Sequence, residues 1–197
     1  MIKQLATSIT QYSVTHDWIE SSQYDWCRYA LEKQLCKTLF FLVCLVLTII
    51  THLWIQVGAF VFTFYLFRCR MGGWHASAIW SCQMLSFVLL VGVTLFIGPA
   101  VESIPLFAII VIDTVIIIAT YFVPPVYPME AHFTQEIKRS NIQKKNTLLL
   151  ILVVLQCLSM LISKLEFLSY SMLGLVFTDV SVLLQYFKLK NGRMSRS

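Results

Sequence analysis

Long runs of apolar residues alternate with short polar links along this chain, and the pattern predicts membrane-spanning helices. Clear runs cover residues 78–97, 104–123, 147–162 and 167–187, and we expect residues 98–103 to be a short link and 124–146 a Pro-rich, basic loop. An earlier run, 38–67, is interrupted at Thr51-His52 and again at Gln56-Val57-Gly58. As one helix it would be about 45 Å long, longer than the ~30 Å hydrocarbon layer. Two short, hairpin-like helices at 38–53 and 56–67 are the alternative, and charge decides between the two interpretations.

The first 37 residues are polar and rich in aromatic side chains. Ile2, Leu5, Ile9 and Tyr12 recur at helical spacing, which is typical of an amphipathic helix lying in the membrane interface. A loosely ordered tail is the alternative. The predicted organisation is therefore an interfacial segment, 1–37, followed by a helical membrane domain, 38–197.

Composition agrees with a membrane protein. Apolar residues make up 58% of the 197 residues, charged residues only 13%, and the mean hydropathy is +0.75. A soluble domain carries about 25% charged residues. We therefore predict an all-α integral membrane protein that crosses the cell membrane several times. The net charge of +5 does not indicate nucleic-acid binding, because the basic residues stand in short clusters beside apolar runs.

These clusters also predict the topology. With the hairpin and a cytosolic N-terminus, fourteen basic residues fall on the cytosolic side and only Lys164 falls outside. The fourteen are Lys3, Arg28, Lys33, Lys37, Arg68, Arg70, Lys138, Arg139, Lys144, Lys145, Lys188, Lys190, Arg193 and Arg196. Reading 38–67 as one span would divide them between the two faces. The positive-inside rule therefore favours about six apolar helical segments with both termini cytosolic.

Candidate chemistry lies in residues 72–82, Gly-Gly-Trp-His-Ala-Ser-Ala-Ile-Trp-Ser-Cys, where the chain re-enters the membrane. An imidazole close to a thiol can take its proton, which makes His75 and Cys82 candidates for the base and nucleophile of a cysteine enzyme. In one straight helix they would be about 10.5 Å apart along the axis, too far for a hydrogen bond. We therefore expect His75 to lie in a turn that Gly72 and Gly73 permit.

Two simpler interpretations of these residues remain. Cys82 can be a small buried side chain and His75 an interfacial histidine, with no chemistry between them. Cys69, His75 and Cys82 could also offer ligands to a metal, although their spacing matches no common zinc pattern and no fourth ligand is evident.

The order Gly-Gly-x-His-Ala, five residues, then Cys, after an arginine-flanked apolar hairpin, resembles the signature of the AgrB family, membrane peptidases of quorum sensing. The resemblance spans nearly the whole chain and is complete in Gly72, Gly73, His75, Ala76 and Cys82. One departure lies in residues 123–130, Val-Pro-Pro-Val-Tyr-Pro-Met-Glu, where relatives commonly carry an Ala-Pro-Ala sequence. The substrate recognised here can differ accordingly.

The resemblance implies that Cys82 is the nucleophile and His75 its base. It also implies the substrate, an AgrD-like pro-peptide with an acidic C-terminal tail. Removal of the tail through a thioester and cyclisation to a thiolactone or lactone would follow, and this redox-neutral reaction needs no cofactor. Arg68, Arg70 and the 138–145 region would attract the acidic tail, although topology demands the same charges.

Other classes of function stay open. A non-enzymatic transporter or export component for a peptide or ion would use Asp113 and Asp179, which fall within apolar runs where ionisable groups are costly. A structural partner of a larger membrane complex is a third possibility. A homodimer is expected to cover the short hairpin.

Overall fold

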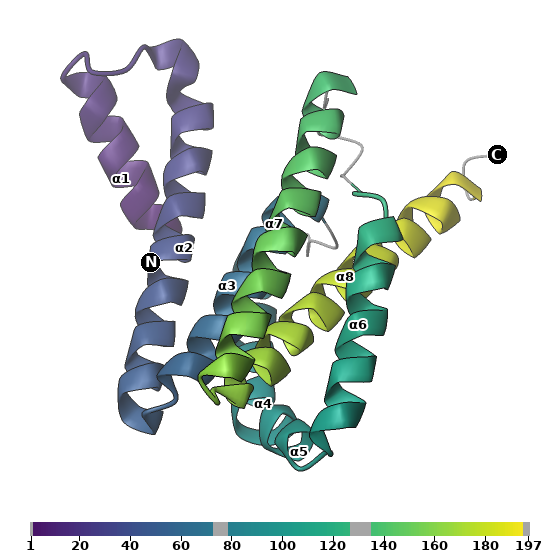
Figure 1. The fold of residues 1–197 in the computed structure, drawn as a ribbon. Helices are drawn as coiled ribbons and strands as arrows, with labels where there is room; N and C mark the ends of the chain where they lie inside the picture. Colours follow the sequence, from purple (N-terminus) through teal and green to yellow (C-terminus); the bar gives the residue numbers. More distant parts are fainter. Residues whose placement is uncertain (1, 73–78, 127–134, 195–197) are drawn as a thin grey trace. The chain divides into compact units, whose positions relative to one another are not determined.

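A computed structural model describes residues 2–72, 79–126 and 135–194; of residues 79–83 and 191–194 it describes the backbone alone. Helices make up nearly all of this part of the chain, and it contains one isolated β-bridge but no strand. The helices are α1 (Ile2–Thr15), η1 (Ser21–Gln23), α2 (Tyr24–Thr51), α3 (Trp54–Met71), α4 (Ile79–Gly92), η2 (Val93–Ile97), α5 (Gly98–Glu102), α6 (Leu106–Phe122), α7 (Gln135–Leu161) and α8 (Leu165–Met194) (Figure 1). The predicted all-α class is confirmed.

Each of the six predicted apolar segments is helical where it is described. Among the described residues, four helical stretches are long and apolar enough to cross a membrane: Ser21–Thr51, Met84–Glu102, Gln135–Leu161 and Leu165–Lys190. The shorter α6 is also apolar. Six spans and the cytosolic termini stay predictions. The chain does break between the first two segments, since His52 adopts a left-handed φ of 57°.

The chain divides into two units, Met1–His52 with Ala76–Val88 and Leu53–His75 with Leu89–Ser197. In the first unit α1 folds back along α2 (Figure 1). Ala6 and Thr10 are buried, and the Thr10 hydroxyl donates to the carbonyl oxygen of Ala6 (2.8 Å). Leu5 and Ile9 remain exposed, so the predicted helix is confirmed and its apolar stripe is available to a membrane surface. The boundary predicted at residue 37 stays a prediction, because α2 runs across it without a break.

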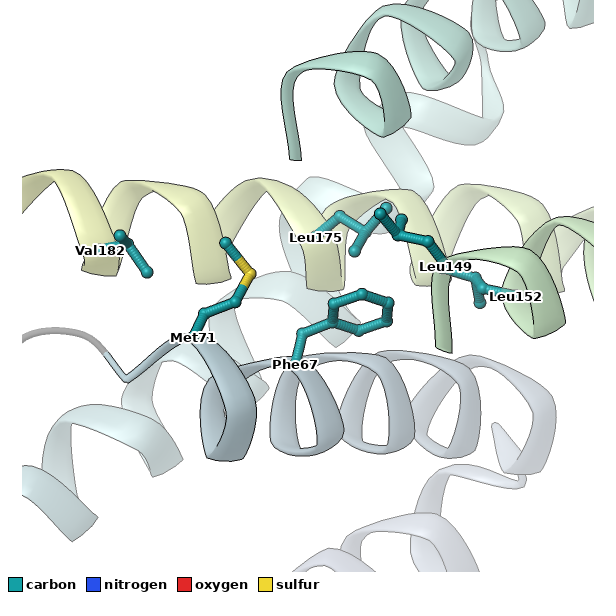
Figure 2. Close-up of a cluster of buried hydrophobic side chains, with 6 residues drawn as sticks. All are labelled: Phe67, Met71, Leu149, Leu152, Leu175 and Val182. Atoms are coloured by element: carbon teal, nitrogen blue, oxygen red, sulfur yellow. The ribbon is translucent and has the colours of Figure 1, made fainter. Parts of the chain in front are cut away.

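In the second unit α8 contacts α3, α5, α6 and α7. The core lies between α3, α7 and α8 (Figure 2) and consists of Phe67, Met71, Leu149, Leu152, Leu175 and Val182. Nearer the start of α8, Leu168 and Met172 form a second cluster with Ile109 of α6. α8 is therefore the central helix of this unit.

Two segments that were predicted to be links between helices contain helix instead. Residues 98–103 were expected to be a loop, but α5 covers most of them and continues η2 without a break. Residues 124–146 were also expected to be a loop, but α7 begins at Gln135. Hydropathy detects only the apolar part of a helix, which suits lipid. α7 also includes about three turns of polar sequence before its apolar run begins at residue 147.

Candidate active site

The two residues predicted to carry the chemistry are described only in part. His75 lies outside the described residues. Cys82 belongs to α4, and its side chain also lies outside them. The His75–Cys82 pairing, and the metal-binding alternative that shares these residues, stay predictions.

The segment that leads to His75 is described as far as Gly72. α3 ends at Met71, and Gly72 then adopts a φ of 74° and a ψ of −134°, with its N–H donating to the carbonyl oxygen of Arg68 (3.0 Å). A positive φ favours glycine, because other residues place a Cβ against the backbone there. Gly72 therefore uses the backbone freedom expected of it, whereas the turn expected to hold His75 lies outside the described residues and stays a prediction.

The same segment pairs with the chain that follows α6. The Val126 N–H donates to the carbonyl oxygen of Met71 (2.8 Å), and Gly72 and Val126 form a parallel bridge. Residues 71–72 and 126 are more than fifty positions apart, so no local pattern predicted this pairing. This pairing joins the Pro-rich segment to the residues that directly precede the segment with His75.

Lys145 lies near this pairing, and its role differs from the one expected. Only 2% of the residue is exposed, and its ammonium donates to the carbonyl oxygens of Thr120 (2.9 Å), Tyr121 (2.8 Å) and Val123 (2.9 Å). Lys145 was expected to help attract an acidic tail, but it is buried against the end of α6. Lys138, Arg139 and Lys144 remain exposed.

A lysine at the polar edge of an apolar helix usually extends to the membrane surface, which is why the sequence suggested a solvated charge. One signal pointed the other way. Lys145, Leu149, Leu152 and Gln156 follow one another at helical spacing, and all four are buried. The lysine belongs to the inward face of α7.

Two carboxylates within the apolar helices have hydrogen-bond partners. Asp179 accepts from the Thr120 hydroxyl (2.7 Å). Asp113 accepts from the Gln156 amide (3.2 Å), which also donates to the Ser171 hydroxyl oxygen (2.9 Å). Both carboxylates thus join networks between helices.

These contacts bring the C-terminal ends of α3 and α6 and the N-terminal part of α7 to one end of the second unit. The C-terminal half of α8 reaches the same end, since Val182 packs in one cluster with Met71 (Figure 2). Basic residues gather on these helix ends: Arg68, Arg70, Lys138, Arg139, Lys144, Lys188 and Lys190. Lys164 lies in the turn between α7 and α8, at the other end. Within this unit the basic residues therefore divide between the ends as expected; which end faces the cytosol stays a prediction.

The family model for AgrB, accessory gene regulator B, matches residues 2–189, nearly the whole chain. The chain belongs to the AgrB family. Membership in AgrB implies a membrane protein with a role in processing a quorum-sensing pro-peptide. Searches among curated proteins and among solved structures gave no significant match.

Proposed function

We propose that this AgrB chain is a membrane cysteine endopeptidase that removes the acidic C-terminal tail of a pro-peptide and promotes cyclisation of the remainder. The observation that carries the proposal is the family match over residues 2–189, together with the Gly-Gly-x-His-Ala and Cys motif of residues 72–82.

In the proposed reaction His75 takes the proton of the Cys82 thiol, and the thiolate attacks the carbonyl carbon of the peptide bond before the tail. The carbon–nitrogen bond breaks, the imidazolium gives its proton to the leaving amine, and the tail departs. A thiol or hydroxyl of the peptide then gives its proton to His75 and attacks the thioester carbon. The bond from that carbon to the Cys82 sulfur breaks, and the sulfur takes the proton back from His75. The product is a thiolactone or lactone, and no electron is transferred.

Cyclisation requires that water does not reach the thioester first, since hydrolysis would compete. The expected place of Cys82, at the edge of the hydrocarbon layer, supports this requirement. The exposed Lys138, Arg139 and Lys144 would attract the acidic tail. A homodimer is part of the proposal, to be tested by crosslinking in native membranes.

Mass spectrometry of a co-expressed pro-peptide tests the proposal. The peptide should come from the reading frame beside the gene for this chain. Cys82→Ala and Cys82→Ser should abolish tail release, and His75→Ala should slow it by about 10²-fold or more. Cys157→Ala is the matched control, because Cys157 is an exposed thiol on α7 and should not affect release. Wild-type processing by both Cys82 variants would overturn the proposal.

The alternative, a non-enzymatic transporter or export component, is favoured by the buried carboxylate of Asp113, of which 5% is exposed. Asp113→Asn keeps an oxygen that can accept from Gln156 but removes the charge. A transporter that works through this charge should lose function in Asp113→Asn and keep it in Cys82→Ala. The peptidase should show the reverse.

A further inference from the structure

The ammonium of Lys145 uses all its hydrogen-bonding capacity on one helix end. It has three N–H donors and no acceptor, and it donates to three carbonyl oxygens, those of Thr120, Tyr121 and Val123. The last carbonyl groups of a helix have no partner within the helix. Lys145, from α7, supplies that partner to the end of α6.

Charge strengthens this contact. The C-terminal end of a helix carries partial negative charge, which attracts a cation. The carboxylate of Asp179 lies beside Thr120, since it accepts from the Thr120 hydroxyl (2.7 Å). This negative charge also attracts the Lys145 ammonium. Thr120 therefore joins α6 to both α7 and α8 through its backbone and its side chain.

The chain that follows the end of α6 connects Lys145 to the predicted site. After α6 the chain is extended at Val123, with a ψ of 119°. Three residues later the Val126 N–H donates to the carbonyl oxygen of Met71 (2.8 Å). Met71 is fully buried and packs in the same cluster as Leu149, one helical turn after Lys145. His75 follows Gly72 by three positions in the sequence.

We propose that Lys145 is a positioning residue for His75. By holding the end of α6 it fixes the 123–126 segment, and by the Val126–Met71 bond that segment fixes the start of the chain that carries His75. Lys145 does not touch the substrate or the sulfur in this account. The inference rests on the proposed function, since it matters only if His75 activates Cys82.

The test measures how fast iodoacetamide alkylates Cys82 as a function of pH, in the full-length protein in lipid nanodiscs. Mass spectrometry of the peptide that contains Cys82 gives the rate for this one thiol. Only the thiolate reacts, so a nearby imidazole shifts the midpoint of the profile below that of a free cysteine. Lys145→Met keeps the aliphatic stem but removes the ammonium. It should move the midpoint up by about one pH unit or more, as His75→Ala should, and the double variant should show no further shift.

Controls separate positioning from loss of stability. Lys164→Met changes an exposed lysine in the turn between α7 and α8, at the other end of this unit, and should keep the wild-type profile. Leu152→Ala weakens the core of the same helix and should lower stability without moving the midpoint. Val126→Pro removes the N–H that donates to Met71 and should shift the profile as Lys145→Met does, whereas Val126→Ala keeps this N–H and should not.

The outcomes are distinguishable. If His75→Ala shifts the midpoint but Lys145→Met does not, the positioning inference is overturned and the proposed function stands. If His75→Ala itself leaves the midpoint unchanged, the proposed function fails at its first step. If Lys145→Met yields no folded protein, Val126→Pro decides: a wild-type profile in that variant overturns the inference.

Discussion

Gly174 of α8 lies against Thr63 of α3 so closely that a Cβ atom at position 174 would stand 2.9 Å from the Thr63 Cβ. The same added atom would lie 3.1 Å from the Phe60 carbonyl oxygen and 3.1 Å from the Phe64 nitrogen. Backbone atoms cannot move aside as a flexible side chain can. Small residues at such crossings let membrane helices approach closely, so Gly174 sets the distance between α3 and α8.

Gly174→Ala should therefore lower the free energy of unfolding by about 1–3 kcal/mol, the usual cost of overpacking a tight contact. Thermal unfolding of the purified protein in detergent measures the loss. Gly58→Ala is the matched control, because a Cβ there meets nothing within 4 Å. Equal stability of the two alanine variants would contradict the assigned role of Gly174.

Leu175→Ala should cost about 2–5 kcal/mol, since the fully buried Leu175 leaves a cavity in the core between α3, α7 and α8. Leu184, on the same helix, is 53% exposed. In lipid an outward leucine keeps apolar contacts whether or not the helices associate, so Leu184→Ala should change stability little. Thermal unfolding of the two variants in parallel makes the comparison. A comparable loss in both would mean that Leu184 faces a partner rather than lipid.

Gln156→Leu should destabilise the protein by about 1–3 kcal/mol, because it removes the amide that donates to the buried Asp113 carboxylate. Replacing both partners by leucine should recover much of this loss, since no polar group is then left without a partner. A double-mutant cycle on unfolding in detergent gives the coupling energy between the two positions. Strictly additive losses would show that the two side chains do not interact.

Thr120→Val removes the hydroxyl that donates to Asp179 and keeps the shape of the side chain. We expect a loss of about 1–3 kcal/mol in stability, because the partly buried carboxylate loses a donor. Thr114→Val is the control, since the hydroxyl of the exposed Thr114 donates to the Ile110 carbonyl oxygen of its own helix. Equal unfolding temperatures for the two valine variants would rule out the Thr120–Asp179 bond as a stabilising contact.

The exposed basic residues at the start of α7 should act on substrate binding. Lys138→Glu and Lys144→Glu should raise KM for a pro-peptide with an acidic tail and leave kcat nearly unchanged, because the charges steer and hold the tail but do not react. The effect should weaken as salt is added. Measuring tail release at low and high ionic strength checks both points; an unchanged KM at low salt would remove these lysines from tail recognition.

Much of the helical architecture follows from local sequence. Hydropathy located all six apolar helical segments, because a lipid-facing helix must carry a run of apolar residues whatever it packs against. The positive φ of Gly72 was also predictable, since glycine is favoured there. The ends of α7 and α5 were not, because helices continue past the apolar region that hydropathy detects.

The sequence by itself determined a helical membrane protein, its apolar segments, its membership in the AgrB family and the His75 and Cys82 candidates. Only the tertiary structure decided that Lys145 points inward to the end of α6, and that Val126 pairs with the residues before His75. The reason is physical: hydropathy and motif spacing are properties of neighbouring residues. The burial of a lysine depends on three carbonyl groups more than twenty positions away, which only packing brings to it.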